Sequence, residues 1–273
     1  MVEFLSYSFF QNAITGVAII SVAAAMIGTY IIARRLVAIS GGITHACFGG
    51  LGLGYFLGIS PIATAAVFAV TSALGVEWLS EKHRVREDSA IAVVWSVGMA
   101  VGVLLVFLTP GFVPELNTFL FGNILTISKG DLAAFAIYTI ILGAFFAWKF
   151  REIVACAFDP DFARVNRLPV KWINMAMTVL VALCIVLTIR LVGIMLLMSM
   201  ISLPQMTAEV FVRKFKGIML LSGGISLVCG LCGLTLATMV DVPCSALIVG
   251  VMCGAYFICR VGKGLFTKST RRA

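Results

Sequence analysis

Residues 12–35 read NAITGVAIISVAAAMIGTYIIARR, and no charged side chain occurs before the final two arginines, Arg34 and Arg35. About 20 apolar residues are enough for a helix to cross the hydrocarbon core of a bilayer. A cleavable signal peptide would begin with basic residues and end at small ones, whereas this chain has Glu3 near its start and arginines after the run. The stretch therefore predicts a first membrane helix that is retained in the protein.

Further apolar runs follow along the chain, which has 273 residues, 61% of them hydrophobic and only 12% charged. A soluble domain is nearer half apolar and a quarter charged, so lipid must solvate part of this surface. The predicted fold is an all-α polytopic membrane protein with about nine transmembrane helices, in a single transmembrane domain over residues 1–273. Only Arg190-Leu191 separates the sixth helix from the seventh, and a broken or re-entrant seventh helix would change the later topology. The expected helices cover residues 12–33, 41–58, 61–80, 89–109, 131–149, 171–189, 191–211, 217–240 and 244–261.

The positive charges lie between these runs in a one-sided way. If the helices cross alternately, only Lys129 and Arg190 of the 20 Lys and Arg residues lie on one side. Short loops rich in Lys and Arg remain cytoplasmic, which predicts an N-terminus outside the cell and a C-terminus in the cytoplasm. The net charge of +8 is spread over loops that face anionic lipid headgroups, so we expect contact with the lipid membrane and no nucleic-acid binding. The other side holds Arg34, Arg35, Lys82, Arg84, Arg86, Lys149, Arg151, Arg164, Arg167, Lys171, Arg213, Lys214, Lys216, Arg260, Lys263, Lys268, Arg271 and Arg272.

The sequence gives little support for an enzyme. It contains no G-x-x-x-x-G-K-[ST] phosphate loop, so this chain is not expected to hydrolyse ATP. Neither H-E-x-x-H nor G-x-S-x-G occurs. Most of the eight cysteines lie in apolar runs, where a thiol packs as a small hydrophobe, and the Cys229-x-x-Cys232 pair has no second pair with which to hold zinc.

The second predicted helix is rich in glycine and contains a histidine. Gly50, Gly54 and Gly58 repeat every four residues, a spacing that lets helix backbones approach closely. His45 is the one histidine predicted at membrane depth, where an ionisable side chain is costly and usually faces a partner or a water-filled path. Neutral imidazole is also a common metal ligand. His45 is therefore either a pathway residue or a hydrogen-bonded packing residue.

The predicted cytoplasmic loop Phe150–Pro169 contains a second candidate site. Asp159 can cap a short helix that has Pro160 at its first position, and Phe162 and Val165 then share one face. Pro169 would end this helix. Such an amphipathic helix could lie on the membrane or dock into a groove of a partner. A second long loop, external, is expected near Thr109–Gly130.

Five segments, taken in order, resemble the integral-membrane permease subunits of bacterial ABC importers for zinc, manganese and iron. Arg34-Arg35-Leu36 with Ser40–Ala46 is similar to the family's R-R followed by G-D-A-L-S-H-A. The others are Phe119–Leu125 (Y-L-F-G-x-x-L), Phe158–Ala163 (F-D-x-x-x-A), Val192–Leu197 with Pro204–Ala208 (V-G-x-L-L, then P-A-A-T-A), and Asp241–Pro243 (D-x-P). The resemblance covers nearly the whole chain.

This resemblance implies a homodimeric permease in the bacterial plasma (inner) membrane. It implies a cytosolic ATP-binding subunit docked on the inner loops and an extracytoplasmic metal-binding protein that delivers a divalent metal ion as substrate, with no permanently bound cofactor. His45 would be a metal ligand in a pathway helix packed through Gly41, Gly50, Gly54 and Gly58. The segment similar to the family's coupling region would dock the ATPase through Asp159, Pro160, Asp161, Phe162, Ala163, Arg164 and Leu168.

One residue departs from the family pattern. The family pairs its pathway histidine with an aspartate four residues earlier, on the same helix face, and this position is Gly41 here. Loss of a carboxylate should disfavour hard Mn(II) more than Zn(II) or Fe(II). Either another helix supplies the second ligand or the cargo is a chelated metal. The alternatives outside this class are a secondary transporter driven by an ion gradient and a structural membrane protein.

Overall fold

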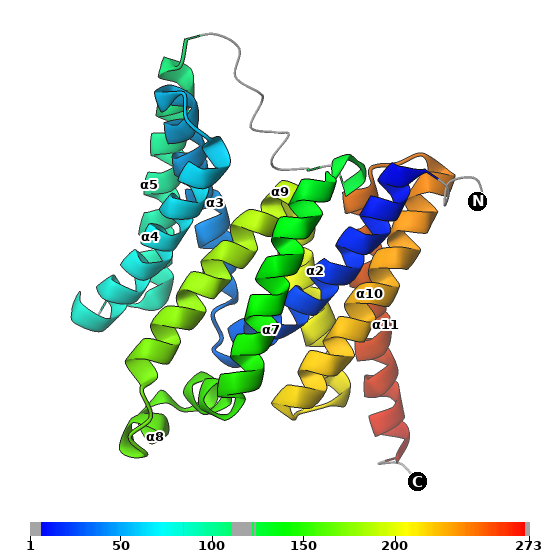
Figure 1. Ribbon diagram of the computed structural model, residues 1–273. Helices are drawn as coiled ribbons and strands as arrows, with labels where there is room; N and C mark the ends of the chain where they lie inside the picture. The colour runs from blue at the N-terminus through cyan, green and yellow to red at the C-terminus, as the bar shows by residue number, and fades with distance from the viewer. Residues whose placement is uncertain (1–6, 84, 111–121, 123, 271–273) are drawn as a thin grey trace. The chain divides into compact units, whose positions relative to one another are not determined.

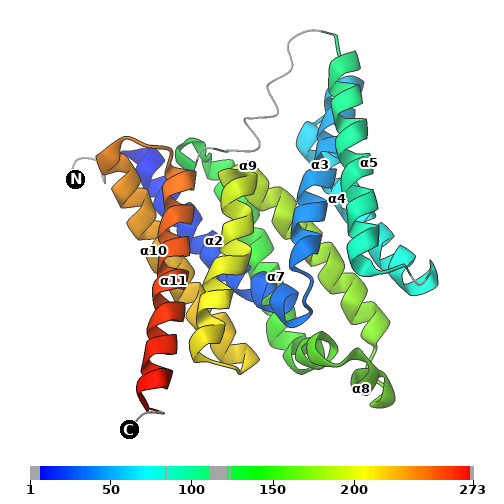
Figure 2. The same ribbon diagram turned by 180° about the vertical axis from the view of Figure 1, so that it is seen from behind.

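The computed structural model describes residues 7–83, 85–110, 122 and 124–270, and every element in those ranges is helical (Figure 1 and Figure 2). Eight of these helices are long and apolar enough to cross a membrane, which confirms the prediction of an all-α, polytopic membrane protein. The predicted residues Arg84, Phe119–Phe121, Asn123, Arg271 and Arg272 lie outside the described ranges. The elements are α2 (Ser8–Ala33), α3 (Val37–Leu57), α4 (Pro61–His83), α5 (Glu87–Leu108), η1 (Ile124–Thr126), α7 (Lys129–Phe158), α8 (Pro160–Val165), α9 (Val170–Phe211), α10 (Phe215–Val240) and α11 (Cys244–Thr270).

The chain divides into two compact units, and each is built from separate stretches of sequence. The first unit comprises Met1–Ala33, Leu120–Ala147 and Leu191–Ala273, and the second comprises Arg34–Phe119 and Trp148–Arg190. Helices α7 and α9 each contribute residues to both units. The single permease domain expected over residues 1–273 stays a prediction.

In the first unit, α10 packs against both α2 and α11. Two buried side-chain hydrogen bonds link segments that are distant in sequence. Gln205 Nε2 donates to the Ala24 carbonyl oxygen at 2.7 Å, and Ser226 Oγ donates to Ser21 Oγ at 3.1 Å. Because lipid offers no replacement partner for a polar group, bonds of this kind help to fix which helices meet.

In the second unit, α3 packs against both α4 and α5 with very little space between the backbones. A Cβ atom added at Gly50 would lie 2.6 Å from Cα of Ala65 in α4. A Cβ atom added at Gly98 of α5 would lie 2.5 Å from Cα of Ala46 in α3. Glycine is therefore required at both contacts, because any side chain there would meet backbone that cannot move aside cheaply.

A hydrogen bond also connects the two stretches of the second unit. Arg34 Nη1 donates to Asn174 Oδ1 at 2.9 Å. Arg34 lies just before α3, and Asn174 lies in the second turn of α9. The bond therefore ties the start of α3 to the first part of α9.

The break between the sixth and seventh predicted helices lies at a different residue from the expected one. Helix α9 runs without interruption through Arg190 and Leu191, and its only non-helical residue is Gly193, with φ 80° and ψ 172°. A straight helix of 42 residues would be about 63 Å long, roughly twice the hydrocarbon thickness. Side-chain-bearing residues rarely adopt the Gly193 conformation, so the chain breaks at the glycine and not at the charge.

The predicted loop Phe150–Pro169 is mostly helical, which corrects that expectation. Helix α7 continues to Phe158 across a kink at Lys149, where φ is −113° and ψ is 19°. Lys149 Nζ donates to Glu152 Oε1 at 2.8 Å, one turn further on. Ile153 and Cys156 are buried and share a helix face, so this continuation is an amphipathic helix held by packing.

Candidate functional site

His45 lies half-buried in α3 and stacks on an indole from a neighbouring helix. The ring centroids of His45 and Trp95 of α5 are 4.4 Å apart, and their planes differ by 3°. Phe48, one turn along α3, has its ring centroid 6.2 Å from that of His45, with 24° between the planes. The histidine lies within Val37–Leu57, which is one of the candidate membrane spans.

The two ring nitrogens of His45 have different surroundings. Nδ1 is buried and has no hydrogen-bond partner among the described residues. Nε2 also lacks a partner there, and it is not enclosed as Nδ1 is. An imidazole that makes no hydrogen bond within its own fold can offer a nitrogen lone pair to a metal ion. The choice between a pathway residue and a packing residue for His45 stays a prediction.

The part of the chain that the structure describes forms no cluster of metal-ligand side chains around His45. Within the described ranges, no group of three or more His, Cys, Asp or Glu side chains gathers that could hold a metal ion. Gly41 is buried in α3 one turn before His45, and offers no side chain. Cys47 lines a separate small cavity with Ala65 and Arg190, and lies on a different face of α3 because it is only two residues from His45.

The predicted packing glycines of α3 do not all have the same role. Gly50 and Gly54 face α4, and a Cβ atom at Gly54 would lie 2.5 Å from Cα of Pro61. Gly58 differs: it is the residue after α3, its φ is 67°, and no atom lies within 4 Å of an added Cβ. It ends the helix through the left-handed conformation that glycine adopts most readily.

The short helix α8 forms as the sequence predicted. Asp159 Oδ1 accepts a hydrogen bond from the Phe162 amide at 2.9 Å, and Pro160 occupies the first helical position. Ala163 is fully buried, whereas the side chains of Phe162 and Val165 are 61% and 83% exposed. Arg164 donates to Asp161 Oδ1 at 3.0 Å on the surface. A helix outside the candidate spans that exposes apolar side chains is typical of a binding surface for another protein.

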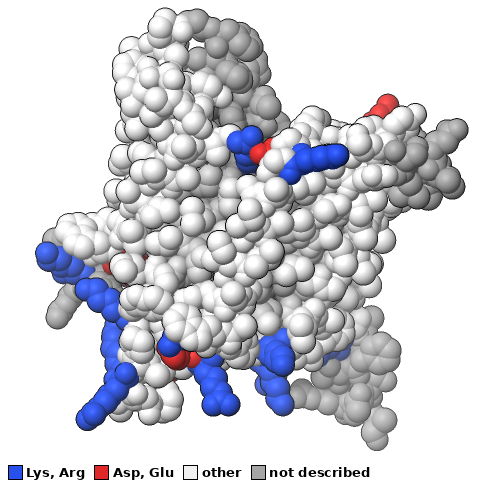
Figure 3. All heavy atoms as spheres, viewed as in Figure 1, with Lys and Arg blue, Asp and Glu red and all other residues white. Residues whose placement is uncertain are grey.

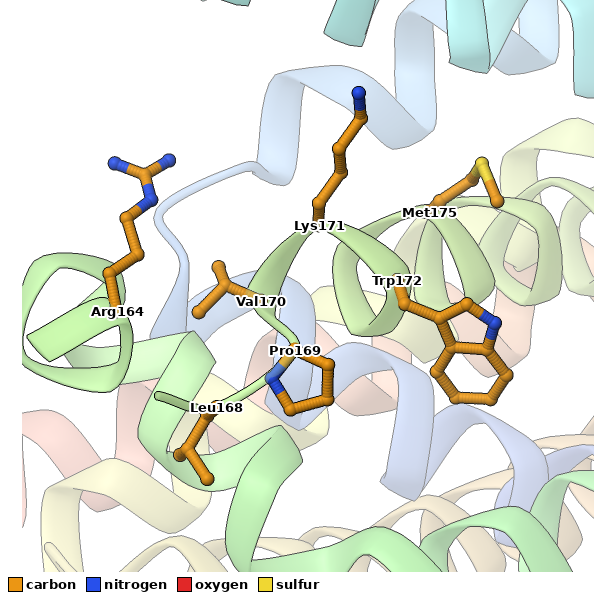
Figure 4. Close-up of a pocket in the computed structure, with 7 residues that line it drawn as sticks. All are labelled: Arg164, Leu168, Pro169, Val170, Lys171, Trp172 and Met175. Atoms are coloured by element: carbon orange, nitrogen blue, oxygen red, sulfur yellow. The ribbon is translucent and has the colours of Figure 1, made fainter. Parts of the chain in front are cut away.

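A groove of about 540 Å³ lies where α8 is followed by α9 (Figure 4). In this view the Arg164 and Lys171 side chains both point toward the top, and the Trp172 ring lies at the lower right. The groove therefore combines cationic groups with an apolar wall, directly beside the exposed α8 helix. Its lining residues are Arg164, Leu168, Pro169, Val170, Lys171, Trp172 and Met175.

Sequence reasoning found His45, Arg164 and Leu168 but missed the tryptophans beside them. Trp95 lies three residues before Gly98 and seven before Gly102, so all three share one face of α5. That spacing was visible in the sequence. The sequence does not show which helix packs against this face of α5, and the structure shows that it is α3.

Comparison with known proteins gives a consistent result. The profile of the ABC 3 transport family matches residues 6–262. An uncharacterized membrane protein, slr2045, from Synechocystis sp. is 35% identical, over 94% of this chain and 92% of its own length. A "probable metal transport system membrane protein" from Chlamydia trachomatis is 33% identical, over 92% of this chain and 87% of its own. The solved structure of PsaBC from Streptococcus pneumoniae in complex with Fab shares the fold, with a TM-score of 0.83 at 24% identity, over 94% of both chains.

Proposed function

This chain belongs to the ABC 3 transport family, and from that premise we propose that it is the permease of an ATP-driven importer for a transition-metal ion: zinc, manganese or iron. It is a multi-pass membrane subunit of a bacterial ABC transport system, and is not itself the enzyme of that system. The relative from Chlamydia trachomatis, a probable metal transport system membrane protein, supports a metal cargo. The metal is a transported substrate, and we propose no permanently bound cofactor.

The observation that carries this proposal is the state of His45. Placing an ionisable side chain at membrane depth is costly, and proteins keep such groups for a function or satisfy them with hydrogen bonds. His45 has no such bond within the described residues, and one of its nitrogens is accessible. We place His45 in the translocation pathway as a metal ligand, which a second copy of the chain would help to enclose.

The second part of the proposal is ATPase docking on α8. Family membership implies an ATPase subunit and an external binding protein as partners. The exposed Phe162 and Val165, held in place by the Asp159 cap, give α8 the apolar face that such a partner would cover. The docking surface would extend over Asp159, Pro160, Asp161, Phe162, Ala163, Arg164 and Leu168.

The charge pattern supports a cytoplasmic location for α8. Lys and Arg side chains gather around this helix, while the visible sides of α3–α5 above it carry almost none (Figure 3). Basic residues of this kind mark the cytoplasmic ends of membrane helices. If α9 crosses twice, once on each side of Gly193, the N-terminus lies outside and the C-terminus in the cytoplasm.

Metal uptake tests the role of His45. Proteoliposomes that contain the permease, its ATPase and its binding protein should take up one of zinc, manganese or iron on addition of ATP. We expect His45→Ala to lose uptake by at least about tenfold, in line with loss of a ligand contact. His83→Ala, the variant of the chain's other histidine, serves as the matched control and should be unaffected.

Each other result has a defined meaning. Uptake that is unchanged in His45→Ala would remove His45 from the pathway. If none of the three metals enters the complete system, the bare-ion assignment fails, and chelated metals and ion gradients become the next substrates and driving forces to test.

A binding measurement tests the docking surface. Phe162→Ala should weaken the affinity of the purified ATPase subunit for the permease by about tenfold or more, as expected for a central apolar contact. Phe257→Ala in α11 removes an equally exposed phenylalanine, 63% against 61%, and should leave the affinity unchanged. Equal effects of the two variants would contradict docking on α8.

A further inference from the structure

The geometry points to Trp95 as the residue that orients His45 and sets the metal preference of the pathway. This inference rests on the proposed function, because it assumes that His45 binds the transported metal. The observation behind it is the nearly parallel stack, with 4.4 Å between ring centroids and 3° between ring planes. Trp95 itself would touch the metal's ligand and not the metal, so it is a positioning residue.

The stack is fixed by glycine contacts on both sides of it. One turn before the stack, a Cβ atom at Gly42 of α3 would overlap the side chain of Ile91 of α5. One turn after Trp95, Gly98 of α5 meets Ala46, the residue next to His45 in α3, again with no room for a side chain. Because residue numbers rise together along both helices, α3 and α5 run parallel at this interface. The register of the two backbones therefore determines that the indole covers the imidazole.

The stacking contact with Trp95 orients the imidazole ring of His45, a role that a hydrogen bond usually has in metal sites. A metal-binding histidine commonly donates its second ring N–H to a carboxylate or a carbonyl, which fixes the ring plane. In His45 that second nitrogen, Nδ1, is buried and unpaired among the described residues, and Gly41 supplies no carboxylate. The remaining constraint on the ring plane is the contact between the two aromatic faces, which favour offset stacking.

The same arrangement has a consequence for metal choice. Aromatic rings flank the His45 imidazole, and among the described residues no group of three or more His, Cys, Asp or Glu side chains surrounds it. Imidazole suits Zn(II) and Fe(II), whereas Mn(II) relies more on carboxylate and carbonyl oxygens. The Trp95 indole adds aromatic surface beside the imidazole and brings no carboxylate. The cargo class that fits is a divalent metal with affinity for nitrogen, with zinc or ferrous iron ahead of manganese.

Metal binding by the purified homomeric permease, measured by calorimetric titration with ZnCl₂ and MnCl₂, tests the inference without transport. Trp95→Leu removes the aromatic face, and should lower zinc affinity by about 10- to 100-fold, the range seen when a residue that orients a ligand is lost. Trp95→Phe keeps a stacking ring, and should stay within about threefold of the unmodified protein. Trp148→Leu, a change at an exposed tryptophan of α7, is the matched control. Thermal unfolding of each variant checks that it is folded.

A second variant makes the test independent of folding effects. Gly41→Asp introduces a carboxylate one helical turn before His45, on the same face. In the Trp95→Leu protein it should restore zinc affinity at least in part, and it should narrow the ratio of zinc to manganese affinity, because the oxygen ligand favours manganese. A purely structural role for Trp95 predicts neither change.

The outcomes separate this inference from the proposed function. If His45→Ala loses zinc binding while Trp95→Leu binds zinc normally, the positioning role is wrong and the pathway role of His45 stands. If His45→Ala binds zinc normally, both are wrong. Tighter binding of manganese than of zinc by the unmodified protein would overturn the metal preference.

Discussion

Helices α3 and α11 both carry glycines four residues apart, yet the two pairs have opposite surroundings. Added Cβ atoms at Gly50 and Gly54 of α3 would lie 2.6 Å and 2.5 Å from the backbone of α4. Added Cβ atoms at Gly250 and Gly254 of α11 would have no described atom within 4 Å. The same spacing therefore marks a smooth helix face in both cases, but it does not reveal whether another helix covers that face.

The largest difference in stability between the two helices should come from a leucine in place of Gly50 in α3 or Gly250 in α11. Gly50→Leu places a side chain against Cα of Ala65 and the Thr64 carbonyl oxygen, so α3 and α4 must separate. We expect a loss of stability of at least about 3 kcal/mol, at the upper end for overpacking. Gly250→Leu should cause no loss of stability, because its side chain would extend into open space within a helix. Thermal unfolding in detergent measures both, and equal losses would refute the contrast.

An alanine at Gly54 tests the same contact between α3 and α4 with a single added methyl group. Gly54→Ala should destabilise the protein by about 1–3 kcal/mol, because its Cβ meets the backbone at Pro61. Denaturant titration of the purified permease would show this as a lower midpoint. A midpoint at or above that of the unmodified protein would mean that α4 can move away at little cost.

Gly58 separates a backbone effect from a packing effect. Nothing surrounds its added Cβ, but its φ of 67° is unfavourable for other residues. Gly58→Ala should therefore cost about 1 kcal/mol, and Gly58→Asn less, since asparagine tolerates the left-handed region. Melting temperatures check this prediction: we expect the lowest value for Gly58→Ala, a higher one for Gly58→Asn, and the highest for the unmodified protein. An equal effect of the two substitutions would indicate a cause other than the backbone.

The smallest expected effect on stability is an increase. Gly250→Ala fills open space within an α-helix and should stabilise the protein by about 0.4–1 kcal/mol, because alanine has less conformational freedom to lose. The melting temperature of the purified protein would rise slightly. A decrease would show that something outside this chain covers the α11 face.

The course of the helices was largely predictable because length and apolar composition are what a bilayer requires. The cap of α8 was also predictable, since Asp159 and Pro160 act on their immediate neighbours. A charged residue in an apolar run predicts a helix boundary, so the sequence predicts the break in α9 at Arg190. The backbone instead breaks at Gly193, because glycine accepts φ 80° with ψ 172°.

The unpredicted features all depend on contacts between distant residues. The α7 extension to Phe158 relies on burial of Ile153 and Cys156, which the local sequence does not reveal. The stack of Trp95 on His45 depends on which face of α5 meets α3. Single-sequence reasoning identified the ligand candidate but had no means of identifying its neighbour.

The hydrogen bond between Arg34 and Asn174 has a mechanical consequence. Asn174 lies one turn after the α8–α9 connection, and Arg34 lies just before the helix that carries His45. A force applied to α8 can therefore reach α3 by a short route: along the first turns of α9, across one hydrogen bond, and into the backbone at Arg34. Within the second unit, this hydrogen bond is one of the links through which a displacement of α8 can reach the start of α3.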